Sequence, residues 1–254
     1  MKMSFNKKII AANWKMNKNT EDSVEFINKL RRDVAENIDS EIIVFPSAIS
    51  LEKVSELCKN SNIIVGAQNC HWESSGAFTG EISVEMIKSV GAKYVLVGHS
   101  ERRNYFLEND ETINKKIKKV VSSGLMAVLC IGENFEQHLK SLTKNILETQ
   151  LKSGLNGVSF EDLKNIVIAY EPVWAIGTGK AVEPNEADEI GEFIKNIIFN
   201  EFGANIPVIY GGSVNLTNAV DLLSLKNIDG VLIGGASLDE KSLSKIIKIA
   251  NGVK

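Results

Sequence analysis

The sequence is short of several features that mark other classes of protein. Its 254 residues include three cysteines, Cys58, Cys70 and Cys130, which form neither an even set nor a Cys-x-x-Cys pair. Such cysteines predict reduced thiols in a cytoplasmic protein rather than a disulfide framework. The formal net charge of −3 shows no basic excess, which argues against a nucleic-acid-binding surface.

Long apolar runs and dividing segments are also lacking. No stretch approaches the roughly eighteen uncharged apolar residues that a membrane-spanning helix requires. The apolar run at residues 9–12 is interrupted by Asn13 and Lys15, too early for a signal peptide. No low-complexity or linker-like segment divides the chain. We therefore expect a soluble cytoplasmic protein with one domain, residues 1–254, and with no membrane or nucleic-acid partner.

Short apolar runs alternate with amphipathic stretches along the whole chain. Eight runs are typical of buried strands: Ile9–Asn13, Ile42–Phe45, Ile63–Gln68, Tyr94–Gly98, Met126–Ile131, Ile166–Tyr170, Val208–Tyr210 and Gly230–Ile233. Three stripes at helical spacing are the clearest: 24, 27, 30, 34 and 38; 113, 117, 120 and 121; and 190, 193, 194, 197 and 198. The alternation indicates parallel strands, and eight such units predict an α/β fold, a closed (β/α)8 barrel.

A doubly wound sheet is the alternative fold. It would normally have a glycine fingerprint at its first strand–helix turn, whereas residues 13–17 of this chain read NWKMN. In a barrel, the chemistry gathers in the loops that follow the carboxyl ends of the strands. Functional side chains are therefore expected in those loops.

The sixth predicted strand ends in a sequence that suggests a catalytic base. Glu171 follows the apolar run at 166–170, and Pro172 then prevents the strand from continuing in a sheet interior. An apolar segment, 173–176, and Gly177-Thr-Gly-Lys180 come next. A carboxylate beside a proline hinge and an apolar flap fits a base beneath a lid that excludes water. The alternative is a surface glutamate followed by an ordinary loop.

Two further strands end in candidate functional side chains. Asn13 and Lys15 follow the first strand, and His99 follows the fourth. If a helix begins at Ser100, its positive end keeps the imidazole neutral, and a neutral imidazole still donates a hydrogen bond to a carbonyl oxygen. Lys15 is interpreted either as a solvated loop lysine or as a functional ammonium, and His99 as either structural or catalytic.

Glycine-rich turns after the last two strands are candidates for phosphate binding. The turns contain Gly211, Gly212 and Ser213, and Gly234 and Gly235, respectively. Exposed backbone amides before a helix form an anion site, and phosphate-binding barrels have it after strands seven and eight. The alternative is that these glycines only make tight turns. No His, Cys or Asp cluster has metal-ligand spacing, so we expect no metal.

Together these residues predict a reaction class. A carboxylate base, a neutral imidazole, a lysine cation and a phosphate cradle suit proton abstraction next to a carbonyl group. We therefore expect a small phosphorylated aldehyde or ketone as the substrate.

Eight segments spread over the chain also identify a family. They are AANWKMN at 11–17, AQNC at 67–70, GAFTGEIS at 76–83, VGHSERR at 97–103, CIGE at 130–133, AYEPVWAIGTGK at 169–180, YGGSV at 210–214 and DGVLIGGAS at 229–237. In these segments the chain resembles triosephosphate isomerase, from end to end and in register. The resemblance implies interconversion of dihydroxyacetone phosphate and D-glyceraldehyde 3-phosphate in glycolysis and gluconeogenesis, with no cofactor.

The resemblance also implies roles for individual residues, because the mechanism of this family is an established example of pKa tuning. Glu171 would move a proton between neighbouring carbons through an enediol(ate), and His99 would act as the neutral electrophile. Lys15, with Asn13 beside it, would balance negative charge. The phosphate would be held by Gly177, Ser213, Gly234 and Gly235. Closure of the flap at 172–180 would exclude water.

The loop Asn69 to Ile82 after the third strand is long and has apolar residues near its tip. Loops of this kind are usually functional or contact partners. The resemblance implies a homodimer, in which Thr79 reaches the neighbouring active site near Asn13. A mobile surface loop is the alternative.

Three departures from the family pattern lie away from these residues. Leu107 stands where the family often has glycine, and His138 and Ser141 replace an arginine and a glycine. Two other functions are weighed against isomerase activity. One is a Schiff-base aldolase with Lys15 as nucleophile, and the other is an inactive barrel that only binds a sugar phosphate. The presence of Lys15, His99 and Glu171 argues against the inactive barrel.

Overall fold

The computed structural model describes residues 7–36, 39–175 and 182–253. Within them, eight parallel strands pair in sequence order and close into a barrel, because β1 pairs with both β2 and β8. The strands are β1 Lys8–Asn13, β2 Ser40–Phe45, β3 Ile63–Ala67, β4 Tyr94–Val97, β5 Met126–Ile131, β6 Ile166–Tyr170, β7 Val208–Tyr210 and β8 Gly230–Ile233. The (β/α)8 barrel expected from the sequence is confirmed, and the doubly wound sheet is excluded.

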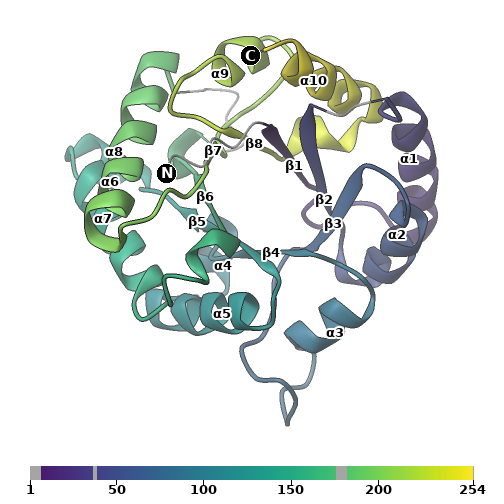
Figure 1. Cartoon of the computed structure of the whole chain (residues 1–254), viewed down its shortest axis with the longest axis horizontal. Coiled ribbons are helices and arrows are strands. Elements are labelled where there is room, and N and C mark those ends of the chain that lie inside the picture. The colour runs from purple at the N-terminus through teal and green to yellow at the C-terminus, as the bar shows by residue number, and fades with distance from the viewer. Residues whose placement is uncertain (1–6, 37–38, 176–181, 254) are drawn as a thin grey trace.

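Helices surround the strands as an outer ring (Figure 1). They are α1 Thr20–Asp33, α2 Leu51–Cys58, α3 Val84–Ser89, α4 Ser100–Tyr105, α5 Asp110–Ser122, α6 Phe135–Leu139, α7 Thr143–Leu155, α8 Pro184–Phe202, α9 Ala219–Leu223 and α10 Glu240–Gly252. Short 3-10 helices are η1 Ala48–Ser50, η2 Leu163–Asn165, η3 Val173–Ala175 and η4 Gly235–Leu238. No helix among the residues described is long and apolar enough to cross a membrane.

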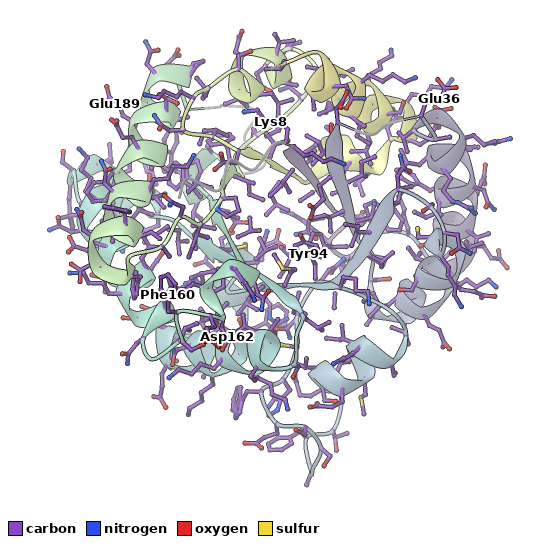
Figure 2. All side chains as sticks on the ribbon, in the orientation of Figure 1. Lys8, Glu36, Tyr94, Phe160, Asp162 and Glu189 are labelled. Carbon is purple, nitrogen blue, oxygen red and sulfur yellow. The ribbon has the colours of Figure 1, made fainter. Side chains whose placement is uncertain are left out.

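The strands are apolar throughout because both of their faces are buried. Alternate residues such as Ile10 and Ala12 pack outward against the helices, whereas Ile9 and Ala11 belong to a second cluster, built from strand residues, that fills the barrel. Figure 2 shows one member of this inner cluster, Tyr94, in the middle of the ring. A packed interior of this kind leaves the ends of the barrel as the place for a ligand.

The first helical stripe predicted from the sequence is partly wrong. Helix α1 ends at Asp33, and its buried face is formed by Ser23, Phe26, Ile27 and Leu30. Val24 is half-buried, and Ile38 lies outside the described residues. Val34 is buried as predicted but lies just after the helix, because apolar spacing alone does not mark where a helix ends. The second stripe is confirmed in full, since Ile113, Ile117, Val120 and Val121 are all buried in α5.

The predicted loop between β3 and α3 projects away from the ring (Figure 1). His71 is buried and stacks on Trp72 with ring centroids 4.1 Å apart, and Phe78 also contacts the His71 ring. Residues 73–81 are exposed. The loop is therefore anchored at its base by aromatic packing while its tip faces solvent.

Candidate active site

A cavity of about 260 Å³ lies at the carboxyl ends of the strands. It brings together all the predicted site residues except Gly177, which lies outside the described residues. Those that line the cavity are Asn13, Lys15, His99, Glu171, Ser213, Gly234 and Gly235. Its small volume suits a ligand smaller than the drug-sized molecules held by pockets of roughly 300–1,000 Å³.

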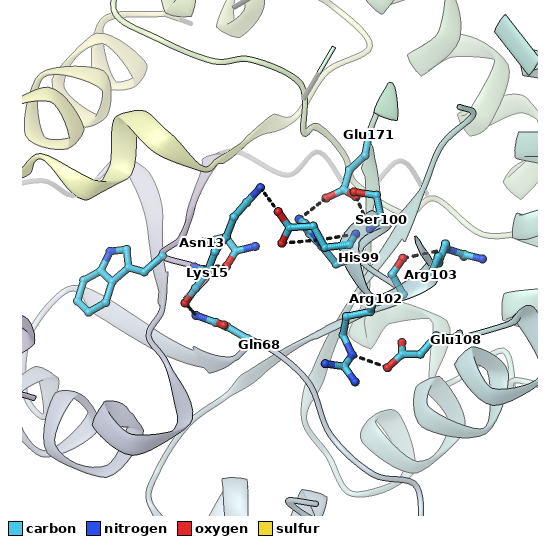
Figure 3. Close-up of polar contacts among 12 residues, drawn as sticks. Asn13, Lys15, Gln68, His99, Ser100, Arg102, Arg103, Glu108 and Glu171 are labelled. Carbon is cyan, nitrogen blue, oxygen red and sulfur yellow. Dashed lines mark hydrogen bonds and ion pairs between the residues drawn. The ribbon is translucent and has the colours of Figure 1, made fainter. Parts of the chain in front are cut away.

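Glu171 is held at the end of β6 with its carboxylate almost completely buried. The side chain is 2% exposed. Its Oε2 accepts a hydrogen bond of 3.0 Å from the backbone N–H of Ser100, and its Oε1 lies 3.2 Å from Nε2 of His99 (Figure 3). The Glu171 N–H donates to the Ile131 carbonyl at 2.7 Å, which fixes the backbone at this point. The base predicted from the sequence is thus a buried carboxylate next to an imidazole.

His99 occupies the N-cap of α4, and this position determines its tautomer. Its Nδ1 accepts a hydrogen bond of 3.3 Å from the backbone N–H of Glu101. A nitrogen that accepts an N–H carries no proton, so the neutral ring has its proton on Nε2, the atom that faces Glu171. Helix α4 begins at Ser100, as the prediction of a neutral imidazole required.

Lys15 adopts a left-handed backbone conformation with φ of 52°. Asn13 Oδ1 accepts a hydrogen bond from the Lys15 N–H at 3.0 Å, and Gln68 donates to the Lys15 carbonyl at 2.9 Å. The ammonium pairs with Glu101 at 2.8 Å (Figure 3). Non-glycine residues in this region are strained and persist only where neighbours hold them. These contacts place the ammonium at the cavity, beside Glu101.

The two glycine turns complete the wall of the cavity, and the first of them lies against the Glu171 side chain. A Cβ at Gly212 would lie 2.1 Å from the Tyr210 hydroxyl, and one at Gly234 would lie 3.4 Å from Cε of Lys15. Ser213 Oγ donates to the Ala175 carbonyl at 2.6 Å. Only the second turn leads directly into a helix, η4 at Gly235; after the first, α9 begins at Ala219. The expectation that both turns immediately precede helices is therefore correct for one of them.

Several residues of the site were not assigned a contact from the sequence. The Ser100 amide and the Glu101 carboxylate come from the same strand end as His99, so the VGHSERR segment marked their position without revealing their partners. Gln68 holds the Lys15 loop by two donations, to the carbonyls of Lys15 and Phe45. Cys130 lies next to Glu171, and burial together with that carboxylate raises the pKa of its thiol. The thiol therefore stays protonated and serves as packing.

No group of three or more His, Cys, Asp or Glu side chains in the described part of the chain is arranged to hold a metal ion. The cavity combines a buried carboxylate, an imidazole whose Nδ1 accepts a backbone N–H, a lysine and two glycine turns. These define a class of protein: a (β/α)8-barrel enzyme built for acid–base chemistry on a small anionic substrate.

Comparisons with known proteins identify the family. The family model described as triosephosphate isomerase matches residues 8–250. The triosephosphate isomerase of Acetivibrio thermocellus is 46% identical, over 96% of this chain and 99% of that protein. That of Chloroherpeton thalassium is 43% identical, with the same two coverages of 96% and 99%. The crystal structure of triosephosphate isomerase from Bartonella henselae superimposes with a TM-score of 0.87 at 34% identity, covering 96% of this chain and 98% of that one.

The chain belongs to the triosephosphate isomerase family, as its sequence segments predicted. It is an isomerase that interconverts dihydroxyacetone phosphate and D-glyceraldehyde 3-phosphate, the reaction shared by glycolysis and gluconeogenesis. Nothing in the site or the comparisons favours the inactive sugar-phosphate-binding barrel.

Proposed function

We propose that Glu171 is the base that transfers a proton between the two substrate carbons and that His99 is the neutral acid that serves the substrate oxygens. The observation that carries this proposal is the 3.2 Å approach of Glu171 Oε1 to His99 Nε2 at the wall of the cavity. Both groups are buried, which strengthens their interactions with a bound substrate.

The substrate must replace the contact between these two groups. With His99 Nε2–H donating to a substrate carbonyl oxygen, Glu171 turns from the imidazole toward the carbon next to that carbonyl. The polarised carbonyl makes the proton on this carbon more acidic, and the negative charge that develops on oxygen forms the enediol(ate). His99 moves a proton from the hydroxyl on the first carbon to the oxygen of the former carbonyl, and Glu171 returns its proton to the former carbonyl carbon, which gives the isomeric carbonyl compound.

Lys15 is proposed to balance the charge of the phosphate and the enediolate, with Asn13 holding the Lys15 backbone. Ser213, Gly234 and Gly235 are proposed to bind the phosphate, supported by their place on the cavity wall and by the helix start at Gly235. Gly177 is assigned to the same group from the resemblance alone. The flap proposed at 172–180 is described only as far as Ala175, at the end of η3.

The Schiff-base alternative makes Lys15 a nucleophile, and one experiment separates it from proton transfer. Wild-type protein is incubated with dihydroxyacetone phosphate and borohydride, and its mass and residual activity are measured. We expect isomerisation without any covalent adduct, because the Lys15 side chain is engaged in an ion pair with Glu101 at 2.8 Å. A reduced substrate adduct on Lys15 would overturn the proposed roles.

We further propose that two copies form a homodimer through the loop Asn69 to Ile82. A groove of about 480 Å³ adjoins the active site and is lined in part by Met16, Gln68, Glu101 and Phe106. Met16 is 97% exposed and Phe106 is 64% exposed. Apolar side chains so exposed beside a groove are typical of an interaction surface. The exposed tip of the loop, with Thr79, would fill this groove in the neighbouring copy and close its active site.

Two coarser expectations complete the proposal. Residues 1–254 are proposed to form a single domain, supported by the pairing of β8 with β1, which joins the two ends of the described chain in one barrel. A cytoplasmic location is supported by the cysteines, all three of which are buried and free of disulfide bonds.

A further inference from the structure

A second cluster of polar side chains lies behind the turn that follows Glu171. Glu133 is completely buried, and its Oε1 accepts hydrogen bonds from the Trp174 indole N–H at 2.8 Å and from the Tyr170 hydroxyl at 3.3 Å. The backbone carbonyl of Glu133 also accepts from the Val173 N–H at 3.0 Å. Glu133 therefore holds η3 by hydrogen bonds from both its side chain and its backbone, and we call these contacts the Glu133 grip. Helix η3 begins two residues after the proposed base.

His138 on α6 lies next to both Trp174 and Glu133. Its ring lies over the Trp174 indole with centroids 4.4 Å apart and planes inclined by 32°. Its Nδ1 is 3.7 Å from Glu133 Oε1, the same oxygen that accepts from the indole. The other carboxylate oxygen, Glu133 Oε2, is buried without a hydrogen-bond partner among the described residues. The His138 side chain is 30% exposed, so it exchanges protons with solvent.

We propose that His138 is a positioning residue whose protonation tightens the grip of Glu133 and Trp174 on the turn that carries Glu171. An imidazolium is attracted both to the buried carboxylate and to the face of the indole ring, whereas a neutral imidazole makes only a weak contact with each. An arginine would carry its charge at every pH, whereas a histidine changes charge between about pH 5 and 8.

The other ionisable groups around His138 do not provide the same change of charge. On its own helix, Glu136 pairs with Lys140 at 2.5 Å, and both are exposed. From β6, burial and the Glu133 charge raise the pKa of the Tyr170 hydroxyl, which keeps it neutral. On the neighbouring α7, Lys144 lies over the Phe193 ring. Beyond Tyr170, Glu186 of α8 adds negative charge that acts on the Tyr170 hydroxyl. Burial raises the pKa of the Glu133 carboxyl, which the imidazolium opposes.

The consequence for catalysis rests on the role proposed for Glu171. That carboxylate is tied to Ser100 and His99 and must turn toward the substrate in each cycle. A firmer hold on Trp174 opposes movement of the same turn. Protonation of His138 should therefore lower kcat on the acid side, where the imidazolium is present, and this effect should disappear as the pH rises.

The test compares wild type with His138→Gln and His138→Arg. The indole N–H resonance of Trp174, assigned by its loss in Trp174→Phe, is followed by NMR between about pH 5.5 and 8.5, and kcat is measured over the same range. In wild type we expect this resonance to shift with pH. We also expect the ratio of kcat at low pH to kcat at high pH to be about threefold smaller in wild type than in His138→Gln. The Gln variant should lose the Trp174 shift, while the resonance of Trp72, which stacks on His71 in the loop after β3, should be the same as in wild type.

His138→Arg is the second variant of the test, because the arginine side chain is charged at every pH. It should show the lower kcat at both ends of the pH range and no pH-dependent shift of Trp174. Equal ratios of kcat in wild type and His138→Gln, or a Trp174 resonance that does not respond to pH in wild type, would overturn the proposal. So would a Gln variant impaired equally at every pH. The resonance is read without substrate, so these outcomes are distinct from a failure of the role of Glu171, which Glu171→Asp tests.

Discussion

Gly211 provides a way to displace the proposed base by a small, defined amount. A Cβ at this position would lie 2.8 Å from Cγ of Glu171 and 3.3 Å from the Tyr170 carbonyl oxygen. Contacts below 3.0 Å require a neighbour to move, and the Glu171 side chain is the movable one. The Gly211 backbone is not in the left-handed region, so Gly211→Ala changes the packing without straining the turn.

The expected effect follows from this geometry. Relieving the overlap moves the carboxylate by several tenths of an ångström, and because a misplacement of about 1 Å can cost about a hundredfold in rate, we expect kcat to fall about tenfold. Crowding in a packed site also costs about 1–3 kcal/mol of stability, which leaves a protein of this size folded.

The assay is steady-state conversion of D-glyceraldehyde 3-phosphate, with circular dichroism to verify folding. Gly252→Ala is the matched control, because a Cβ there meets nothing within 4 Å and the residue lies at the end of α10. We expect this control to retain wild-type kcat. A folded Gly211→Ala variant with kcat within about twofold of wild type would show that the carboxylate position is not set by this contact.

Two further predictions concern the departures from the family and the loop. Leu107 has φ of 56° and is 85% exposed. Leu107→Gly removes backbone strain of about 1–2 kcal/mol, and the greater freedom of glycine in the unfolded chain costs about 0.5–1 kcal/mol. We expect Tm to rise by about 2–3 °C in thermal unfolding, with Leu107→Ala unchanged; a lower Tm for the glycine variant would contradict the strain argument. Shortening the loop between Asn69 and Ile82 should give monomers with greatly reduced turnover, measured by analytical ultracentrifugation and kinetics, and full activity in a demonstrated monomer would refute the dimer proposal.

The strands were predictable because the sequence signal and the physical constraint coincide. In a parallel barrel both faces of each strand are buried, so each strand is a continuous apolar run. The predicted boundaries of the last four strands match the observed ones, and those of the first four differ by one or two residues at one end. The end of α1 was not predictable from apolar spacing, because Phe26 replaces Val24 on the buried face and the helix ends before the stripe does.

The convergence of Glu171, His99 and Lys15 was also predictable, since all follow strand ends on one face of the barrel. Their hydrogen-bond partners were not. The contacts from the Ser100 amide to Glu171 and from Glu101 to Lys15 depend on three-dimensional register between strands far apart in the chain. The same holds for His138: the sequence marks it as a departure from the family, but only the fold brings it against Trp174 and Glu133.

The central claim is that the Glu171 carboxylate is the base, and Glu171→Asp tests it most directly. The variant keeps the charge but withdraws the carboxylate by about one bond length, so we expect kcat for D-glyceraldehyde 3-phosphate to fall by about a hundredfold or more while the protein stays folded. A folded Glu171→Asp variant that matches the wild-type rate would contradict the account, because the base would then lie elsewhere.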